Sequence, residues 1–498
     1  MPRLNKHNLF ATLPPVWPAS LLPDIRRALS GTCSKLVVLD DDPTGTQTVH
    51  DIPVLTTWGT DELSAELAND LPAFYLLTNT RAFPADEAVR INRQIVTNLR
   101  QASTQLAVPR KFVLVSRSDS TLRGHFPAEV DTLAHVLAGA PSNPPQNRPS
   151  RPEAERGAGL PQDRRHLPPV LIIPYFEAGG RFTVGNIHYV AEGDDLVPAA
   201  DTPFAKDPAF GYRNSDLCRW VEEKTKGQVR ADKVAFISID DLRRGGPDAV
   251  LAKLLSLNCG EVCVVNAAAP RDLEVLAWSS LQAEQAGRQF VYRTAASFVA
   301  ARIAQEPGPL WEPTGNHEDA GGIVIIGSHV PKTTEQLEHL LAHTEVAGLE
   351  LPVADLLGSG RVEVLRDAAV KTNGLLRAGH DVAVFTSRSL VTGVDPDACL
   401  AIAARVSSAL VALTQALAQR PRFLIAKGGI TSSDLASNAL GVKRAMVLGQ
   451  IVPGVPVWEL GPETKFPGLP YVVFPGNVGG KDALSLAVCK FAQQTLKR

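Results

Sequence analysis

The sequence predicts an α/β protein with two domains, each a mostly parallel sheet layered with helices, and a ligand cleft between the domains. Three observations lead to this prediction. Short runs of Val, Ile and Leu recur along the 498 residues, segments of helical periodicity separate these runs, and a stretch rich in proline and glycine divides the pattern in two. Apolar strands that alternate with helices are typical of buried parallel sheets, and a chain of this length exceeds one ordinary core.

The predicted strands are the continuous apolar runs. They lie at residues 35–40, 111–116, 169–174, 234–239, 261–266, 322–327, 381–386, 422–427 and 471–476. Each run is followed by a glycine or polar turn and then by a helical segment. Pro84 is expected to open a helix that reaches about residue 102, and residues 397–418 are apolar enough for a largely buried helix.

Two segments interrupt the alternation. Residues 139–168 are dense in Pro, Arg, Gln and Ser, which predicts a flexible surface insertion. Residues 305–321 are rich in proline and glycine and lie between a helical segment and a new strand, as a domain linker would. We therefore expect an N-terminal domain over residues 1–304, a linker over 305–321 and a C-terminal domain over 322–498.

Composition argues against several classes of function. The formal net charge is −2 and the basic residues form no long cluster, which argues against nucleic acid or a membrane surface as a partner. The six cysteines lack C-x-x-C spacing, so neither a zinc site nor a disulfide framework is indicated. The N-terminus has no signal-peptide pattern, and no apolar run reaches the roughly 18 residues of a membrane helix. We expect a cytoplasmic protein with a small charged ligand, and the sequence leaves a homo-oligomer open.

In the C-terminal domain, three predicted strands end in glycine loops that precede helices. The loops are Gly327-Ser328-His329, Gly428-Gly429-Ile430-Thr431 and Gly476-Asn477-Val478-Gly479-Gly480. A strand, a glycine turn and a helix N-terminus direct backbone N–H groups at one point, which suits phosphate oxygens. Any one loop could be an ordinary turn, but the set favours a nucleotide. Neither a Walker A loop nor the protein-kinase motifs are present.

In the N-terminal domain, the first buried strand ends in Asp40-Asp41-Asp42-Pro43-Thr44-Gly45. Carboxylates at a strand end are costly to bury without partners, so we expect one to bind substrate hydroxyls or to act as a general base. The alternative interpretation is a cluster of turn and capping residues.

Two further polar segments follow predicted strands. Residues 116–133 crowd Arg117, Asp119, Ser120 and Arg123 into a short turn, and two guanidinium groups there could hold a substrate carboxylate. The plainer interpretation is a helix cap with a surface ion pair. The segment 174–190 contains Arg181 and is expected to face the same cleft.

Taken in order, these motifs resemble the four-carbon acid sugar kinases, which phosphorylate threonate, erythronate or oxo-tetronate. The resemblance spans nearly the whole chain. It is carried by the Asp41-Asp42-x-Thr44-Gly45 loop, the turn 119–124, the segment 174–190, residues 202–208 and the C-terminal glycine loops. One departure is Ile430, which stands where family members commonly carry Glu.

The resemblance implies an N-terminal sugar-acid domain and a C-terminal ATP domain that uses MgATP. The predicted catalytic residues are Asp41, Asp42 and Asp119, with a base in the 41–42 pair preferred. The predicted substrate-binding residues are Thr44, Gly45, Arg117, Ser120, Arg123, Gly180 and Arg181. The predicted nucleotide-binding residues are Ser328, Gly428, Gly429, Thr431, Gly476, Asn477 and Gly479. The sequence does not identify metal ligands.

Two other functions remain open at this point. Asp40-x-Asp42-x-Thr44 at a strand end is also the pattern of a haloacid dehalogenase-like phosphatase, with Asp40 as the nucleophile and Asp240-Asp241 as a metal-binding pair. The substitution at Ile430 is compatible with a protein that binds its ligands without turnover.

Overall fold

The computed structural model describes residues 3–31, 34–139, 164–314, 320–389, 391 and 396–492. It confirms the predicted α/β class with mostly parallel sheets and two parts. The first unit comprises Met1–Asp41 and Trp58–Pro307, and the second comprises Asp42–Thr57 and Gly308–Arg498.

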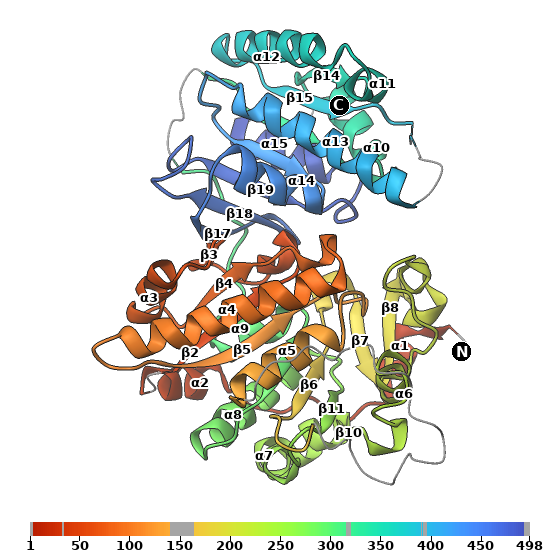
Figure 1. The fold of residues 1–498 in the computed structure, drawn as a ribbon. Helices are drawn as coiled ribbons and strands as arrows, with labels where there is room; N and C mark the ends of the chain where they lie inside the picture. Colours follow the sequence, from red (N-terminus) through yellow and green to blue (C-terminus); the bar gives the residue numbers. More distant parts are fainter. Residues whose placement is uncertain are drawn as a thin grey trace. The chain divides into compact units, whose positions relative to one another are not determined.

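The first unit contains a parallel sheet with the strand order β10-β11-β6-β12-β5-β2-β4 (Figure 1). Its strands are β2 (Ser34–Asp40), β4 (Ala73–Leu77), β5 (Lys111–Arg117), β6 (Val170–Ile173), β10 (Ala235–Ile237), β11 (Val262–Val265) and β12 (Val291–Thr294). These neighbours pair in parallel, so the strands end along one edge. Their apolar runs are continuous because helices cover both faces of the sheet.

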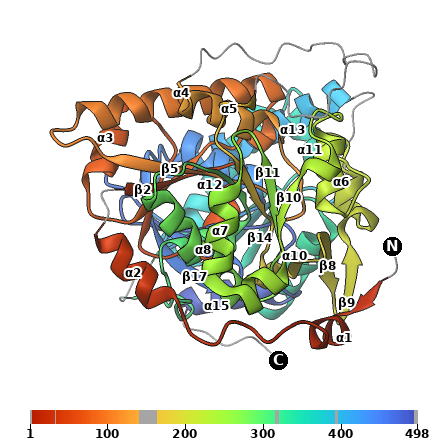
Figure 2. The same cartoon turned by 90° about the horizontal axis from the view of Figure 1, so that it is seen from below.

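Helices form a layer on each face of this sheet (Figure 2). One layer contains α3 (Thr60–Ala68), α4 (Ala85–Gln105) and α5 (Ala128–Leu137), which pack together. The other contains α2 (Leu22–Ser30), α7 (Gly246–Ser256), α8 (Pro270–Gln285) and α9 (Ala296–Arg302). Helix α4 begins one residue after Pro84, close to its predicted start.

A smaller antiparallel sheet also belongs to the first unit, with the order β1-β9-β8-β7. Its strands are β1 (Leu4–Asn5), β7 (Arg181–Val184), β8 (Ile187–Glu192) and β9 (Asp195–Pro198), and helices α1 (Lys6–Ala11) and α6 (Leu217–Lys224) complete the unit. Thr183 of β7 bridges to Ala267, which follows β11. This bridge attaches the small sheet to the parallel one.

The second unit contains a mixed sheet with the order β3-β17-β18-β19-β16-β13-β15-β14. Its strands are β3 (Ile52–Leu55), β13 (Ile323–Ile326), β14 (Ala347–Leu351), β15 (Val382–Thr386), β16 (Leu424–Lys427), β17 (Arg444–Val452), β18 (Val455–Leu460) and β19 (Pro470–Phe474). The part from β19 to β14 is parallel, and β3, β17 and β18 pair antiparallel.

Helices also cover both faces of the second sheet. One layer contains α10 (Pro331–His343) and α15 (Ala483–Ala492), and the other contains α11 (Val353–Leu357), α12 (Arg361–Arg377) and α13 (Pro396–Gln415), with α14 (Gly429–Asp434) beside α13. Residues from α10, α15 and the central strands form a buried apolar core that includes Phe423, Val472 and Leu484. The loops that follow the strands are therefore attached to a well-packed core.

The structure differs from the predicted domain boundaries at residues 42–57, which belong to the second unit. The physical reason is strand pairing: β3 pairs with β17, and the short helix η1 (Pro43–Thr46) packs against α14, β18 and β19. The predicted insertion at 139–168 lies mostly outside the described residues, as do residues 315–319 of the predicted linker.

Candidate functional site

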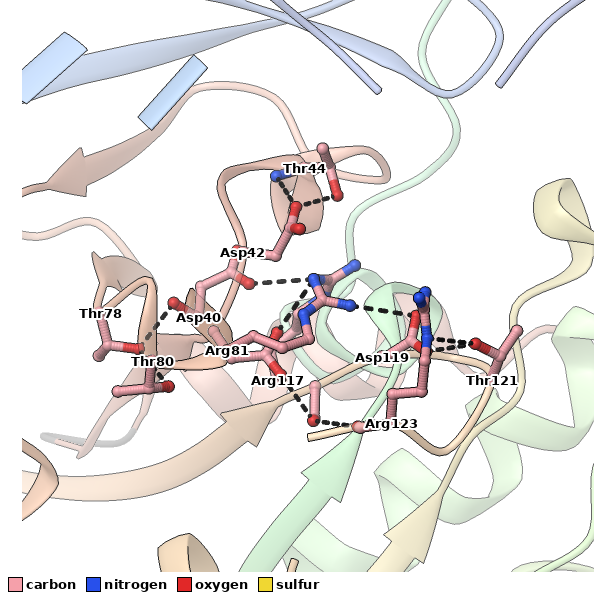
Figure 3. Close-up of polar contacts among 12 residues, drawn as sticks. Asp40, Asp42, Thr44, Thr78, Thr80, Arg81, Arg117, Asp119, Thr121 and Arg123 are labelled. Atoms are coloured by element: carbon pink, nitrogen blue, oxygen red, sulfur yellow. Dashed lines mark hydrogen bonds and ion pairs between the residues drawn. The ribbon is translucent and has the colours of Figure 1, made fainter. Parts of the chain in front are cut away.

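In the first unit, polar residues gather where the parallel strands end. The register places Asp40 of β2 beside Arg117 of β5, and Arg117 beside Thr294 of β12. The residues that follow these strands therefore enter the same edge of the sheet, where open α/β sheets bind ligands. Figure 3 shows the resulting cluster of carboxylate and guanidinium side chains.

Asp40 and Asp41 are both buried, at 2% and 3% exposure, and both lie against guanidinium groups. Arg117 Nη1 donates to Asp40 Oδ1 at 3.1 Å and lies 3.8 Å from Asp41 Oδ1. Arg81 Nη2 lies 3.6 Å from the same oxygen of Asp41, and Ser118 Oγ donates to Asp41 Oδ2 at 2.8 Å. Buried carboxylates require such partners. Arg117, Arg81 and Ser118 therefore fix the orientation of the Asp41 carboxylate.

Asp119 connects two arginines in the turn after β5. Arg123 Nε donates to Asp119 Oδ2 at 2.7 Å, Arg81 Nη1 lies 3.3 Å from Asp119 Oδ1, and Thr121 Oγ1 donates to Oδ2 (Figure 3). Burial alone would raise the pKa of Asp119, but Arg123 and Arg81 outweigh it and hold that pKa well below its usual range. Asp119 is therefore a permanent anion at neutral pH, and its geometry suits it to orienting the two guanidinium groups.

Arg181 is a guanidinium of this region with no hydrogen bond or ion pair to any residue that the structure describes. Its Cζ lies 5.4 Å from the centroid of the Phe204 ring, and Arg123 Cζ lies 5.2 Å from the same ring. Burial lowers the pKa of Arg181. Because a partly buried cation without a counter-charge is costly, this position suits an anionic ligand, and a carboxylate matches the guanidinium fork.

The loop before Arg181 is shaped by backbone requirements. Gly180 has φ +73°, and a Cβ there would lie 2.9 Å from Ala191 Cβ, so a larger residue is excluded. Behind the loop, His188 Nε2 donates to Ser120 O at 2.8 Å while Nδ1 accepts from Thr183 Oγ1 at 2.9 Å. Burial lowers the pKa of His188 to about 4, so its imidazole is neutral at pH 7. Gly180 and Ser120, both predicted to bind substrate, thus have clear backbone roles here.

Three residues of the cluster were not singled out from the sequence: Arg81, Glu129 and Arg293. Arg81 follows β4, whose apolar run at 73–77 is a strand signal that would have led to it. Arg293 Nη2 donates to Arg123 O at 3.0 Å and to Ser118 Oγ at 3.3 Å. No local motif identifies Arg293 or Glu129. Arg293 lies within strand β12 and Glu129 lies within helix α5, so neither belongs to a loop that follows a strand.

Glu129 is buried in the first turn of α5. Its Oε1 accepts from Thr80 Oγ1 at 2.6 Å and from Asn92 Nδ2 at 3.3 Å. Burial, followed by the charge of Asp41, raises the pKa of Glu129. Thr80 begins the short helix η2 (Thr80–Ala82), so this carboxyl group anchors the segment that carries Arg81.

In the second unit, the register aligns the ends of the parallel strands in the same way. Ile326 of β13, Lys427 of β16 and Phe474 of β19 are cross-strand neighbours. The three predicted glycine loops therefore begin at one edge of this sheet. Their backbone N–H groups and the N-terminus of α10 are the elements that commonly bind phosphate.

Ser328 is the residue on which these loops converge. A Cβ on Gly428 would lie 3.1 Å from Ser328 Cβ, and a Cβ on Gly476 would lie 3.0 Å from Ser328 Oγ. Thr333 Oγ1 of α10 donates to Gly476 O at 2.8 Å and lies 3.2 Å from Ser328 Oγ. The φ of Gly428 is +118°, a conformation that side chains rarely adopt. The glycines therefore permit a close approach of three backbones.

Asp42 lies beside the same loops, within the second unit. Its Oδ2 is 3.0 Å from the position that a Cβ on Gly429 would occupy, and its Oδ1 accepts from Thr44 N at 2.8 Å and from Thr44 Oγ1. Trp458 Nε1 donates to Thr46 Oγ1 at 3.1 Å and holds the far end of η1. Asp42 and Thr44, predicted to serve the sugar acid, thus belong to the unit of the glycine loops.

The remaining predicted residues of the second unit lie in the same loops. Gly479 has φ +84°, and a Cβ there would meet Ala483 Cβ at 2.4 Å. A Cβ on Gly327 would likewise collide with Thr431 Oγ1. Asn477 lies between Gly476 and Gly479, and Gly45 is buried within η1.

No group of three or more His, Cys, Asp or Glu side chains among the described residues could hold a metal ion by itself. None of the helices in the described part of the chain is long and apolar enough to cross a membrane.

Family comparison also divides the chain into two domains, but it includes residues 42–57 in the first domain, although they pack with the second unit. Residues 36–302 match the sugar-binding N-terminal domain, and residues 323–484 match the nucleotide-binding C-terminal domain. The chain belongs to this two-domain family. The cluster around Asp41 thus lies within the matched sugar-binding domain, and the glycine loops lie within the matched nucleotide-binding domain. No curated protein matches the chain.

Solved structures share the fold. A Haemophilus influenzae protein of the DUF1537 family has a TM-score of 0.59 and 19% identity, over 91% of this chain and 100% of that chain. A Salmonella typhimurium LT2 protein described as a proposed tRNA synthase has a TM-score of 0.63 and 17% identity, over 92% and 99%. At these identities the similarity establishes the fold and not the activity.

Proposed function

We propose that the protein is an ATP-dependent kinase that phosphorylates a hydroxyl group of a four-carbon sugar acid such as threonate, erythronate or an oxo-tetronate. One observation carries this proposal: the chain passes from the unit with the guanidinium cluster to the unit with the glycine loops between Asp41 and Asp42. Asp41 belongs to the first unit and Asp42 to the second. Phosphoryl transfer needs an acceptor hydroxyl and a nucleotide phosphate brought into line, and a motif shared by both domains serves that need.

The sugar acid's carboxylate would be bound by Arg181 and Arg123, with Arg81 held nearby through Asp119. Arg181 is the leading candidate because it lacks a polar partner among the described residues while Phe204 packs beside its guanidinium. A bidentate guanidinium–carboxylate pair would fix the orientation of the acid. The hydroxyl groups would then face the carboxylate of Asp41.

Asp119, one of the predicted catalytic residues, is better suited to positioning than to proton transfer. Its strongly lowered pKa leaves it a weak base at neutral pH, whereas an effective general base has a pKa near the working pH. We assign the base to the 41–42 pair and prefer Asp42. Its carboxylate lies at the Gly429 loop, where the transferred phosphate would be bound.

Mg²⁺ would accompany the nucleotide. This metal commonly binds through one or two carboxylates and the phosphates themselves, so the lack of a larger acidic cluster among the described residues is compatible with it. When bound, the ion would neutralise negative charge on the phosphates.

The phosphatase alternative fits the geometry poorly. A nucleophilic carboxylate must be accessible, but Asp40 is 2% exposed and accepts a hydrogen bond from Arg117. Asp241, one of the proposed metal ligands, pairs with Lys253 at 2.6 Å. The nucleotide-binding domain would also have no role in that reaction.

The experiment that tests the proposal is a coupled assay of ADP release with a panel of threonates, erythronates and oxo-tetronates of both hands. A kinase gives release that depends on one or a few acids and saturates with their concentration. If ADP binds to the protein but no acid raises the formation of ADP from ATP above background, the protein binds its ligands without turnover. Ile430, in place of the Glu common in the family, would then be the first residue to test.

A further inference from the structure

Two cations beside the glycine loops of the nucleotide-binding unit are at least partly buried and have no carboxylate partner within 4 Å among the residues described here. They are Lys427, the last residue of β16, and Arg388, which follows β15. Most charged side chains in protein interiors are paired, because an unpaired buried charge costs several kcal/mol or more. Two such cations, one at the end of β16 and one just after β15, on either side of β13, therefore need an explanation.

Lys427 is completely buried. Its Nζ donates to the carbonyl oxygen of Pro475 and lies 4.0 Å from the centroid of the Phe474 ring. Burial, followed by the positive charge of Lys332 on α10, lowers the pKa of Lys427 to about 7. Lys332 Nζ itself donates to Gly479 O at 3.3 Å. Two lysine side chains, Lys427 and Lys332, thus donate to carbonyl oxygens of the loop at residues 475–480.

Arg388 approaches the neighbouring loop. Its Nη2 donates to Ser328 O at 2.7 Å and to Thr334 Oγ1 at 3.0 Å. Its Nη1 is buried and has no hydrogen-bond partner within the described part of the chain. Burial lowers the pKa of Arg388, while the more distant Glu350 and Glu338 act to raise it. Nε also donates to Thr334 Oγ1, at 3.2 Å, so Nη1 is the one nitrogen of this guanidinium without a partner among the described residues.

Both cations act on the place where the glycine loops converge. Arg388 is bonded to Ser328, Lys427 is bonded to Pro475 beside Gly476, and Thr333 joins Ser328 to Gly476. The close approach of Gly428 and Gly476 to Ser328 leaves backbone rather than side chains at this point. A site with backbone donors and unpaired positive charge is suited to a multiply charged anion.

We propose that Arg388 and Lys427 supply the positive charge that binds the phosphates of the nucleotide at the Ser328 and Gly476 loops. This inference rests on the proposed function. Arg388 contacts a phosphate oxygen directly. Lys427 is a positioning residue: it acts from beneath the loop, through its charge and its bond to Pro475. The unpaired charge lowers the stability of the free protein and is compensated when the anion binds.

The test compares ADP affinity of the wild type, Arg388→Gln, Lys427→Met and the control Lys371→Met by titration calorimetry between pH 6 and pH 9. Lys371 is an exposed lysine of α12, so the control removes the same charge from the same unit. Each site variant is expected to bind ADP about tenfold or more weakly, as for the loss of a charged hydrogen-bonding group. The control is expected to match the wild type.

The pH series separates a charge effect from a loss of structure. Wild-type affinity is expected to fall as Lys427 loses its proton above about pH 7, and Lys427→Met is expected to lose this part of the pH dependence. Ligand-free Lys427→Met is also expected to melt no lower than the wild type at pH 6, because methionine fills the same space without a buried charge.

Wild-type affinity and pH dependence in a folded Lys427→Met, or wild-type affinity in Arg388→Gln, would overturn the inference. If Lys427→Met does not fold, Arg388→Gln alone decides, because Arg388 is only partly buried. A wild-type protein that binds no ADP would instead refute the proposed function, so the two failures are distinguishable.

Discussion

The carboxylate of Asp42 lies against the backbone of Gly429, with its Oδ2 3.0 Å from the point where a Cβ would stand. The acidic motif that follows β2 therefore packs directly against a glycine loop of the nucleotide-binding unit. This contact leaves little room for a Cβ at residue 429, although the φ of Gly429 lies outside the left-handed region.

Gly429→Ala is expected to displace Asp42 and to lower kcat roughly tenfold or more, because small shifts of a positioned group strongly affect transfer rates. Protein stability should change little, since Asp42 can move. The measurement is kcat in the ADP-release assay together with a melting curve. Gly374→Ala is the matched control: Gly374 lies within α12 with no atom near its absent Cβ, so alanine should leave kcat unchanged and favour the helix. Full activity in Gly429→Ala would show that Asp42 has no role in the transfer.

Arg181→Gln is expected to raise KM for the sugar acid by roughly 10- to 100-fold, because it removes a charged hydrogen-bonding group worth about 1.5–3 kcal/mol. KM for ATP should not change. Arg181→Lys should recover part of the affinity, although it lacks the guanidinium fork. Arg219→Gln, an exposed arginine on α6, is the control. An unchanged KM for the acid in Arg181→Gln would remove Arg181 from the substrate site.

Asp119→Asn is expected to lower stability at pH 7 by about 3 kcal/mol, the low end for breaking a buried ion pair, and to raise KM for the acid. The pKa of Asp119 is held well below normal, so its contribution is present above the unfolded pKa and is lost only as the pH falls through the folded value. The deficit of the variant should therefore persist from pH 8 down to pH 5 in denaturant titrations. A deficit that disappears near pH 6 would contradict this assignment.

Glu129→Gln is expected to fold and to retain activity, because the pKa of Glu129 is raised and the amide oxygen can accept the same hydrogen bonds from Thr80 and Asn92. A raised pKa means that the folded state binds the proton more tightly, so wild-type stability should fall relative to Glu129→Gln as the pH rises above about 4.5. Glu129→Ala leaves Thr80 without its acceptor and should be less stable than either protein. Melting curves across pH test both statements; equal stability of the alanine variant would refute the anchoring role.

The sequence predicts most strands in the parallel parts of both sheets, because strands covered on both faces consist of continuous apolar runs, but the prediction misses β4, β12 and β14. It does not reveal the β17–β18 hairpin. In β17, buried and part-exposed residues alternate around Gly449, and β18 contains Pro456, so neither forms a continuous apolar run. The search for continuous apolar runs therefore does not find these two strands.

The sequence also cannot show that residues 42–57 join the second unit. That membership depends on the pairing of β3, four residues long, with a strand far along the chain. The site residues that could be predicted are likewise those that lie near one another in the sequence or follow adjacent strands. Asp41, Arg117, Asp119 and Arg123 are close in sequence or follow adjacent strands, so the structure brings them together as expected. Arg388 and Lys427 could not be identified as unpaired cations before the fold was known.

The central claim is that this protein moves the γ-phosphoryl group of ATP to a hydroxyl of a four-carbon sugar acid. The most direct measurement follows a radiolabelled γ-phosphate of ATP in the presence of each acid and Mg²⁺. The label is expected to appear in a phosphorylated acid in amounts equal to the ADP formed, and Asp42→Asn and Arg181→Gln are expected to reduce this transfer sharply. Label that appears only in inorganic phosphate, or that remains in ATP with every acid, would contradict it.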